Sequence, residues 1–118
     1  MEDVLLDKKE RDKITDILRS TKFEDFEIHT HFYNNHGLPR HGVDLNKVKE
    51  IYYQFDKIIA IQRRSGNNRF KYCVIYKFSK GTSYYLLFFL DEKPRKLFNA
   101  YHSGKNVEKR LIRKYLNV

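Results

Sequence analysis

Four of the five histidines fall within thirteen residues, from His29 to His41, and the fifth, His102, ends a predicted strand. Imidazole exchanges protons near neutral pH, so these side chains are candidates for general acid–base catalysis. The pair His29 and His31 also has a spacing that would place two metal ligands on one side of a strand. Because no carboxylate-rich stretch accompanies that pair and the surrounding charge is positive, we expect neither a metal nor a cofactor. The alternative for the whole group is a set of polar surface side chains in a loop-rich stretch.

The chemistry that these residue types fit best is cleavage of RNA without a metal. That reaction needs a base for the 2′-hydroxyl proton, an acid for the leaving 5′-oxygen, and cations for the charge that grows on the phosphate. Two predicted strands carry such side chains. In the predicted strand over residues 69–78, alternation puts Arg69 and Lys71 on the same side. In the strand over residues 95–101, it puts Asn99 and Tyr101 on one side and Phe98 on the other. A solvated face of the sheet is the alternative explanation.

Other catalytic signatures are missing from the sequence. The chain has no phosphate-binding glycine loop, no Gly-x-Ser-x-Gly and no dinucleotide-binding fingerprint. Cys73 is the only cysteine, which excludes an internal disulfide and a multi-cysteine metal site. Its neighbours on both sides are apolar, so we predict a buried structural thiol and not a nucleophile.

The charge distribution favours a polyanionic partner. The net charge is +9, and residues 1–27 hold nine of the fifteen acidic residues and six basic ones. Residues 28–118 therefore carry eighteen basic and six acidic residues, with no acidic residue between Asp56 and Asp91. The positive charges of a surface with such an excess of basic residues repel one another unless a polyanion or an acidic partner neutralises them. Nucleic acid is the commoner reason for such an asymmetry, and a lysine-rich composition that reflects solubility or an AT-rich genome is the alternative.

Length and composition are those of a small globular domain. The 118 residues are short for two domains, and 41% hydrophobic with 15% aromatic residues is enough for one packed core. No apolar run approaches the roughly 20 residues that span a bilayer, and the first residues are acidic where a secretory signal would be basic. We therefore expect a cytoplasmic protein without membrane attachment.

The hydrophobic pattern predicts an α+β fold. Helices are expected over residues 7–21, 45–55 and 106–116, with Asp44 as N-cap of the second. Strands separated by short turns are expected over residues 57–63, 69–78, 83–90 and 95–101. Residues 26–32 fit either a strand or the start of a helix. The predicted order is N-terminal helices, a four-stranded antiparallel meander sheet and a C-terminal helix, in a single domain over residues 1–118 with residues 1–27 as an acidic helical extension.

Several segments resemble the BrnT-type toxins, which belong to the RelE-like group within the barnase/EndoU/colicin/RelE fold. The stretch from Arg40 to Asp44, Arg-His-Gly-Val-Asp, followed by a helix, is similar to the basic-His-Gly-Val motif of that family. Arg69 at the start of a strand, an apolar hairpin, the segment from Lys96 to Tyr101 and a basic C-terminal helix follow in the family's order. The resemblance covers residues 28–116.

The resemblance implies a metal-independent endoribonuclease that an antitoxin neutralises. By position, it places His41, Arg69, Asn99 and Tyr101 at or near the active groove. The family's last strand often carries Arg at the position of Tyr101, and the acidic helix over residues 7–21 is additional.

The predicted function is therefore a toxin–antitoxin type endoribonuclease that cleaves RNA by attack of the 2′-hydroxyl. The candidate catalytic residues are His41, Arg69, Tyr101 and His102. The candidate nucleic-acid-binding residues are Arg40, Arg63, Arg64, Lys71, Asn99, Lys105, Lys109 and Arg110. The expected partners are RNA and an antitoxin protein, and a homodimer is a candidate assembly. The alternative is a non-catalytic nucleic-acid-binding module, or a viral or accessory interaction protein, on the same fold.

Overall fold

A six-stranded mixed sheet forms the centre of the computed structural model, which describes residues 3–30, 32 and 43–116. Its strands are β1 (Asp3–Leu5), β2 (Glu27–Ile28), β3 (Ile58–Gly66), β4 (Arg69–Ser79), β5 (Thr82–Phe89) and β6 (Lys96–Ser103), in the order β1-β3-β4-β5-β6-β2. β1 joins β3 antiparallel at one edge, and β2 joins β6 parallel at the other. The α+β class is confirmed. The prediction of a four-stranded, wholly antiparallel sheet is wrong, because two edge strands extend the sheet and one of them runs parallel.

The edge strands are too short to give a periodic pattern in the sequence. β1 has three residues and β2 has two. Backbone hydrogen bonds hold both in place: Leu6 N donates to the carbonyl of Ile61 at 3.0 Å, and His29 N donates to the carbonyl of Leu97 at 2.9 Å. Tertiary pairing therefore decides these strands, and local propensity does not.

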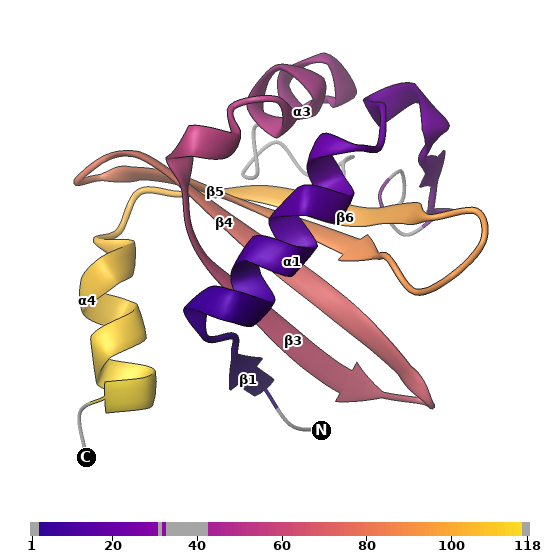
Figure 1. Cartoon of the computed structure of the whole chain (residues 1–118). Helices are drawn as coiled ribbons and strands as arrows, with labels where there is room; N and C mark the ends of the chain where they lie inside the picture. The colour runs from indigo at the N-terminus through magenta and orange to yellow at the C-terminus, as the bar shows by residue number, and fades with distance from the viewer. Residues whose placement is uncertain (1–2, 31, 33–42, 117–118) are drawn as a thin grey trace.

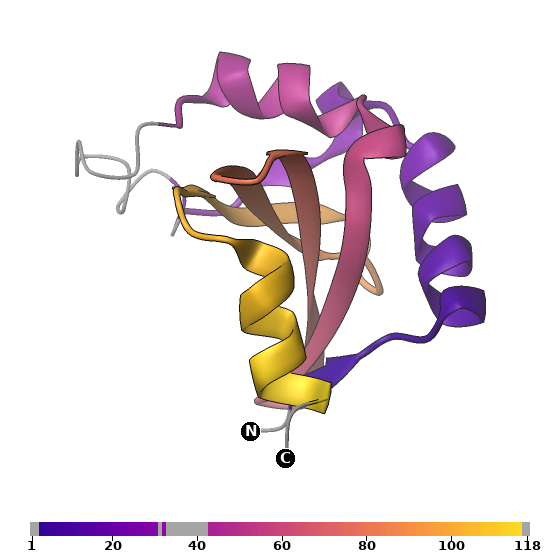
Figure 2. The same ribbon diagram turned by 90° about the vertical axis from the view of Figure 1, so that its left-hand side faces the viewer.

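Helices cover both faces of the sheet, as Figures 1 and 2 show. α1 (Lys8–Arg19) and α3 (Leu45–Tyr52) pack on one face, which we call the α1 face. α4 (Val107–Leu111) and its π-helical continuation η4 (Ile112–Leu116) lie on the other, the α4 face. The short 3-10 turns are η1 (Phe23–Asp25) and η3 (Phe55–Lys57). The predicted order of helices is wrong in that a strand precedes α1 and another separates it from α3.

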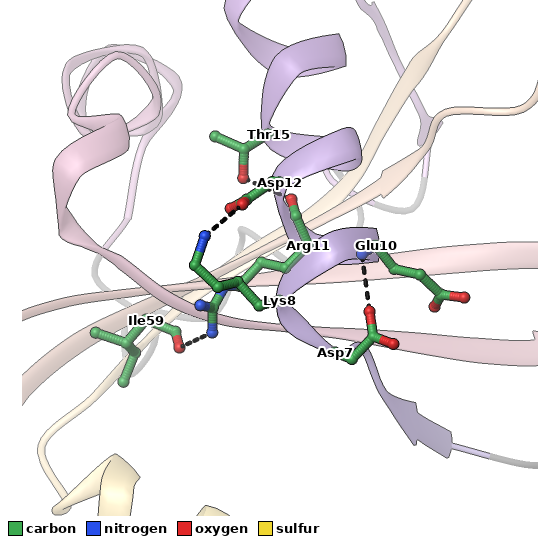
Figure 3. Close-up of polar contacts among 7 residues, drawn as sticks. All are labelled: Asp7, Lys8, Glu10, Arg11, Asp12, Thr15 and Ile59. Atoms are coloured by element: carbon green, nitrogen blue, oxygen red, sulfur yellow. Dashed lines mark hydrogen bonds and ion pairs between the residues drawn. The ribbon is translucent and has the colours of Figure 1, made fainter.

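The start of α1 is determined by a side-chain cap (Figure 3). Asp7 Oδ1 accepts a hydrogen bond from the backbone N–H of Glu10 at 2.9 Å, which satisfies a donor that the first turn leaves open. Asp44 caps α3 in the same way, as the sequence predicts. The Arg11 guanidinium donates to the carbonyl of Ile59 at 3.2 Å and so fastens α1 to β3. None of the helices among the described residues is long and apolar enough to cross a membrane.

The larger core lies on the α1 face and is rich in aromatic rings. Tyr52 is fully buried there, and its hydroxyl lies 2.7 Å from the backbone carbonyls of Leu18 and Thr21. The Tyr76 hydroxyl donates in turn to the carbonyl of Tyr52 at 3.0 Å. Burial raises the pKa of Tyr52, so its hydroxyl stays protonated and remains a donor. These bonds connect α1, α3 and β4 across the core.

The smaller core lies on the α4 face and covers only part of it. Val107 of α4 packs against Ala60, Cys73, Ile75 and Tyr85 of the sheet. Burial raises the pKa of the Cys73 thiol to about 12, so the thiol is neutral near physiological pH. The prediction of a buried structural cysteine is confirmed.

Candidate nucleic-acid interface

Two adjoining cavities open on the α4 face of the sheet. The larger, of about 320 Å³, lies between the sheet and the C-terminal helix and is lined by Gln62, Arg64, Tyr85, Tyr101, Arg110, Leu111, Arg113 and Lys114. The smaller, of about 190 Å³, lies near the β3–β4 turn and is lined by His29, Arg64, Ser65, Gly66, Asn67, Arg69, Lys71, Phe89 and Phe98. Arg64 belongs to both. We call the two cavities together the groove.

The β3–β4 turn sets the register that brings the first cations of the groove together. Asn67 and Asn68 both have positive φ, 51° and 61°, as a two-residue type I′ hairpin turn requires. Asparagine adopts this conformation more readily than most residues. With Gly66 and Arg69 paired across the turn, Arg64 stands directly opposite Lys71. Directly opposed side chains lie on the same face, so both cations are directed to the α4 face.

An irregularity in β6 adds aromatic side chains to the same face. The β5–β6 register shifts between Leu87 and Phe88, as at a β-bulge, so alternation in β6 is interrupted. Phe98 and Tyr101 consequently both pack on the α4 face, while Leu97 packs on the α1 face. The predicted separation of Phe98 from Tyr101 is wrong for this reason. Tyr101 stacks on its cross-strand partner Tyr85 with ring centres 4.9 Å apart.

Part of the positive charge that the described residues place in the groove is not neutralised by an ion pair. Among the described residues, no Asp or Glu lies within ion-pair distance of Lys71, Arg110 or Arg113. Burial lowers the pKa of Lys71, and the neighbouring guanidinium groups of Arg64 and Arg69 lower it further. An anion bound here would relieve this mutual repulsion.

The other three cations of the groove, Arg64, Arg69 and Lys114, have internal partners. Arg69 forms two hydrogen bonds to the carboxylate of Glu92, at 2.7 and 2.8 Å. Arg64 and Lys114 share the carboxylate of Asp3. The groove therefore combines three cations that internal carboxylates neutralise with three that have no ion-pair partner among the described residues.

Cations also lie over aromatic rings along the groove. Lys71 Nζ is 4.1 Å from the centre of the Phe98 ring, and Arg69 Cζ is 3.6 Å from that of Phe89. The ring of His29 packs against Phe89, with ring centres 5.9 Å apart, and against Phe98, with ring centres 5.1 Å apart. Cationic and aromatic side chains are thus interleaved on one surface.

The Tyr101 hydroxyl lies beside the Arg64 guanidinium in the groove. Burial raises the pKa of this hydroxyl, although the neighbouring Arg64 guanidinium lowers it. A phenol with a raised pKa is protonated near neutral pH, so Tyr101 is a hydrogen-bond donor there. Burial raises the pKa of Tyr85 as well.

Five of the predicted site residues line the groove: Arg64, Arg69, Lys71, Tyr101 and Arg110. Two others lie on the opposite, α1 face of the sheet. Arg63 lines a cavity beside α1, and its Cζ lies 4.9 Å from the centre of the Phe70 ring. The ring of His102 packs against that of Tyr84, with ring centres 5.2 Å apart.

The remaining predicted residues are not brought into the groove by the described structure. The Asn99 side chain accepts a hydrogen bond from the backbone N–H of Ala100. Lys105 lies in the link between β6 and α4, and Lys109 is exposed on α4. Arg40 and His41 lie outside the described residues, as do His31 and His36.

The sequence prediction missed several groove residues, namely Gln62, Tyr85, Phe89, Phe98, Arg113 and Lys114. Arg110, Arg113 and Lys114 follow one another at helical spacing, which signals a basic helix face but not that this face turns toward the sheet. His29 also lines the groove, whereas the sequence indicates it only as one of the clustered histidines. Among the described residues, no three His, Cys, Asp or Glu side chains lie together as metal ligands would.

Comparison of the chain with protein-family models, with curated proteins and with solved structures gives no match. The resemblance to the BrnT and RelE-like toxins therefore stays a prediction.

Proposed function

We propose that this chain binds single-stranded RNA in the groove. The observation that carries the proposal is the convergence of six cations, Arg64, Arg69, Lys71, Arg110, Arg113 and Lys114, with aromatic rings on one face of the sheet. Phosphate oxygens are the ligands that such a set of guanidinium and ammonium groups prefers. The interleaved rings would stack on unpaired bases.

The size of the groove favours a single strand over a duplex. A cavity of about 320 Å³ has the volume of roughly ten water molecules in the liquid. This space takes a nucleotide-sized group, whereas a double helix presents phosphates on a wide convex surface. In a single strand the bases are free to turn toward Phe98 and Tyr101.

Fluorescence anisotropy with a labelled RNA oligonucleotide tests the proposal. We expect the native chain to bind the single strand more tightly than the same strand in a duplex, and a variant with Lys71, Arg110 and Arg113 all changed to Gln to lose most of this affinity. The matched control changes three exposed lysines outside the groove, Lys9, Lys22 and Lys80, to Gln. Equal losses in the two variants would contradict a groove-specific interaction, because both lose the same charge.

A second candidate function is cleavage of the bound RNA, favoured by the protonated Tyr101 hydroxyl beside the Arg64 guanidinium. In such a reaction the 2′-oxygen loses its proton to a base and attacks phosphorus, and the bond to the 5′-oxygen breaks. Tyr101 would donate the proton that this leaving oxygen takes up, and Arg64 would stabilise the charged phosphate. The products would be a 2′,3′-cyclic phosphate and a 5′-hydroxyl. An antitoxin partner and a homodimer stay predictions.

Incubation with RNA in EDTA tests this second function. We expect cleavage by the native chain and at least a hundredfold slower cleavage by the variant Tyr101→Phe, since general acid catalysis contributes about 10² to 10⁴ in rate. Retained RNA binding by Tyr101→Phe serves as the control. Cleavage that Tyr101→Phe leaves unchanged would exclude Tyr101 as the acid.

A further inference from the structure

β1 places a carboxylate beside Arg64, the residue that the two cavities of the groove share. Asp3 pairs directly with Arg64 in the antiparallel β1–β3 ladder, so the two side chains lie on the same face of the sheet. Asp3 Oδ2 lies 2.7 Å from Lys114 Nζ and 3.7 Å from Arg64 Nε. Both cations line the larger cavity. Asp3 thus forms ion pairs with one groove cation from β3, Arg64, and with one from η4, Lys114.

Asp3 uses the same donors that a phosphate would use. Carboxylate and phosphate oxygens both accept charge-assisted hydrogen bonds from guanidinium and ammonium groups. The Asp3 side chain is 23% exposed, and the Arg64 and Lys114 side chains are 26% and 46% exposed. Solvent therefore reaches the pair, and an exchange of partners does not require unfolding of the sheet.

We propose that Asp3 is an internal competitor for phosphate, which occupies Arg64 and Lys114 in the free protein and lowers the affinity of the groove for RNA. This inference rests on the proposed RNA binding. It assigns β1 a role in limiting how many cations of the groove are open to phosphate. Among the described residues, the groove cations without an ion-pair partner, here called open, are Lys71, Arg110 and Arg113. Displacement of Asp3 would add Arg64 and Lys114 to them.

The variant Asp3→Asn tests the inference, because it removes the charge and keeps the size of the side chain. We expect it to bind single-stranded RNA roughly two- to fivefold more tightly than the native chain, as loss of a solvent-exposed ion pair implies. The slope of log affinity against log salt concentration should steepen by about 0.7 for each cation that becomes open. The variant Asp3→Glu, which retains the charge, should stay closer to the native chain.

A matched control distinguishes local competition from a general change in charge. Asp12 is also bonded to a lysine, since Lys8 Nζ lies 2.8 Å from its Oδ2, but it lies on α1, on the far side of the sheet (Figures 2 and 3). Asp12→Asn therefore makes the same change in net charge away from the groove. We expect it to leave the salt slope unchanged. Equal effects of Asp3→Asn and Asp12→Asn would overturn the inference.

Substitution of Lys114 tests independently whether Asp3 competes with phosphate. If Asp3 occupies Lys114, then Lys114→Gln in the native background should alter the salt slope little, whereas Arg110→Gln should reduce it by about 0.7. In the Asp3→Asn background, Lys114→Gln should reduce the slope as well, which is a coupling between the two sites. Lys114→Gln and Arg110→Gln with the same effect in the native background would overturn the inference.

The outcomes also separate this inference from the proposed function. Weaker RNA binding by a folded Asp3→Asn variant would mean that Asp3 positions η4, and would overturn competition while leaving RNA binding intact. If neither the native chain nor Asp3→Asn binds RNA, the proposed function fails and the inference fails with it.

Discussion

The salt dependence of RNA binding follows directly from the charges that the groove leaves open. Lys71, Arg110 and Arg113 have no ion-pair partner among the described residues, whereas Arg69 is paired with Glu92. Each phosphate neutralised on a single strand contributes about −0.7 to the slope of log affinity against log salt. Three open cations therefore predict a slope of about −2, and affinity should fall roughly fifteenfold between about 50 and 200 mM salt.

Anisotropy titrations at several salt concentrations measure this slope. Changing Arg110 to Gln should reduce it by about 0.7, and removal of all three open cations should bring it close to zero. The exposed-lysine control variant should keep the native slope. A slope near zero in the native chain, or a slope that Lys71, Arg110 and Arg113 do not influence, would refute the reasoning that these side chains bind phosphate.

Three further predictions concern stability. Tyr52→Phe should lower the free energy of unfolding by about 1 to 2 kcal/mol in urea denaturation, because the buried carbonyl of Thr21 loses its hydroxyl donor; no change would mean that water replaces the hydroxyl. Asp7→Ala should cost about 1 kcal/mol by the same assay, since it removes the cap of α1, and Asp7→Asn should restore most of it. The hydrogen bond from Lys114 lowers the pKa of Asp3 below 3.8 in the folded chain, so this contribution to stability is fully present above pH 3.8 and is lost as the pH falls through the lowered value. The stability difference between the native chain and Asp3→Asn should therefore shrink in acid, and a difference that grows in acid would contradict this sign.

The helix and strand positions that the sequence predicts correctly are those with strong local signals. Asp44 begins α3 as an N-cap, and the expected strand over residues 69–78 corresponds closely to β4 (Arg69–Ser79). The asparagines of the β3–β4 turn favour the backbone conformation that this turn adopts. In each case the residues that determine the structure are neighbours in the sequence.

The parts that the sequence does not predict depend on distant contacts. β1 and β2 have too few residues to show alternation, and their partners lie far along the chain. The shift at Leu87 and Phe88 moves Phe98 to the same face as Tyr101, against simple alternation. Simple alternation does separate His102 from Tyr101, but which side of each strand faces the groove depends on how the helices pack. The contact of Asp3 with Lys114 likewise joins residues far apart in the sequence.

A titration of isotope-labelled protein with a short single-stranded RNA, followed by amide chemical shifts, shows where on the protein the RNA binds. We expect changes in the shifts of the groove, around Arg64, Lys71, Tyr101 and Arg110, with little change along the exposed side of α1. Changes confined to the α1 face, or no saturable change at all, would contradict it.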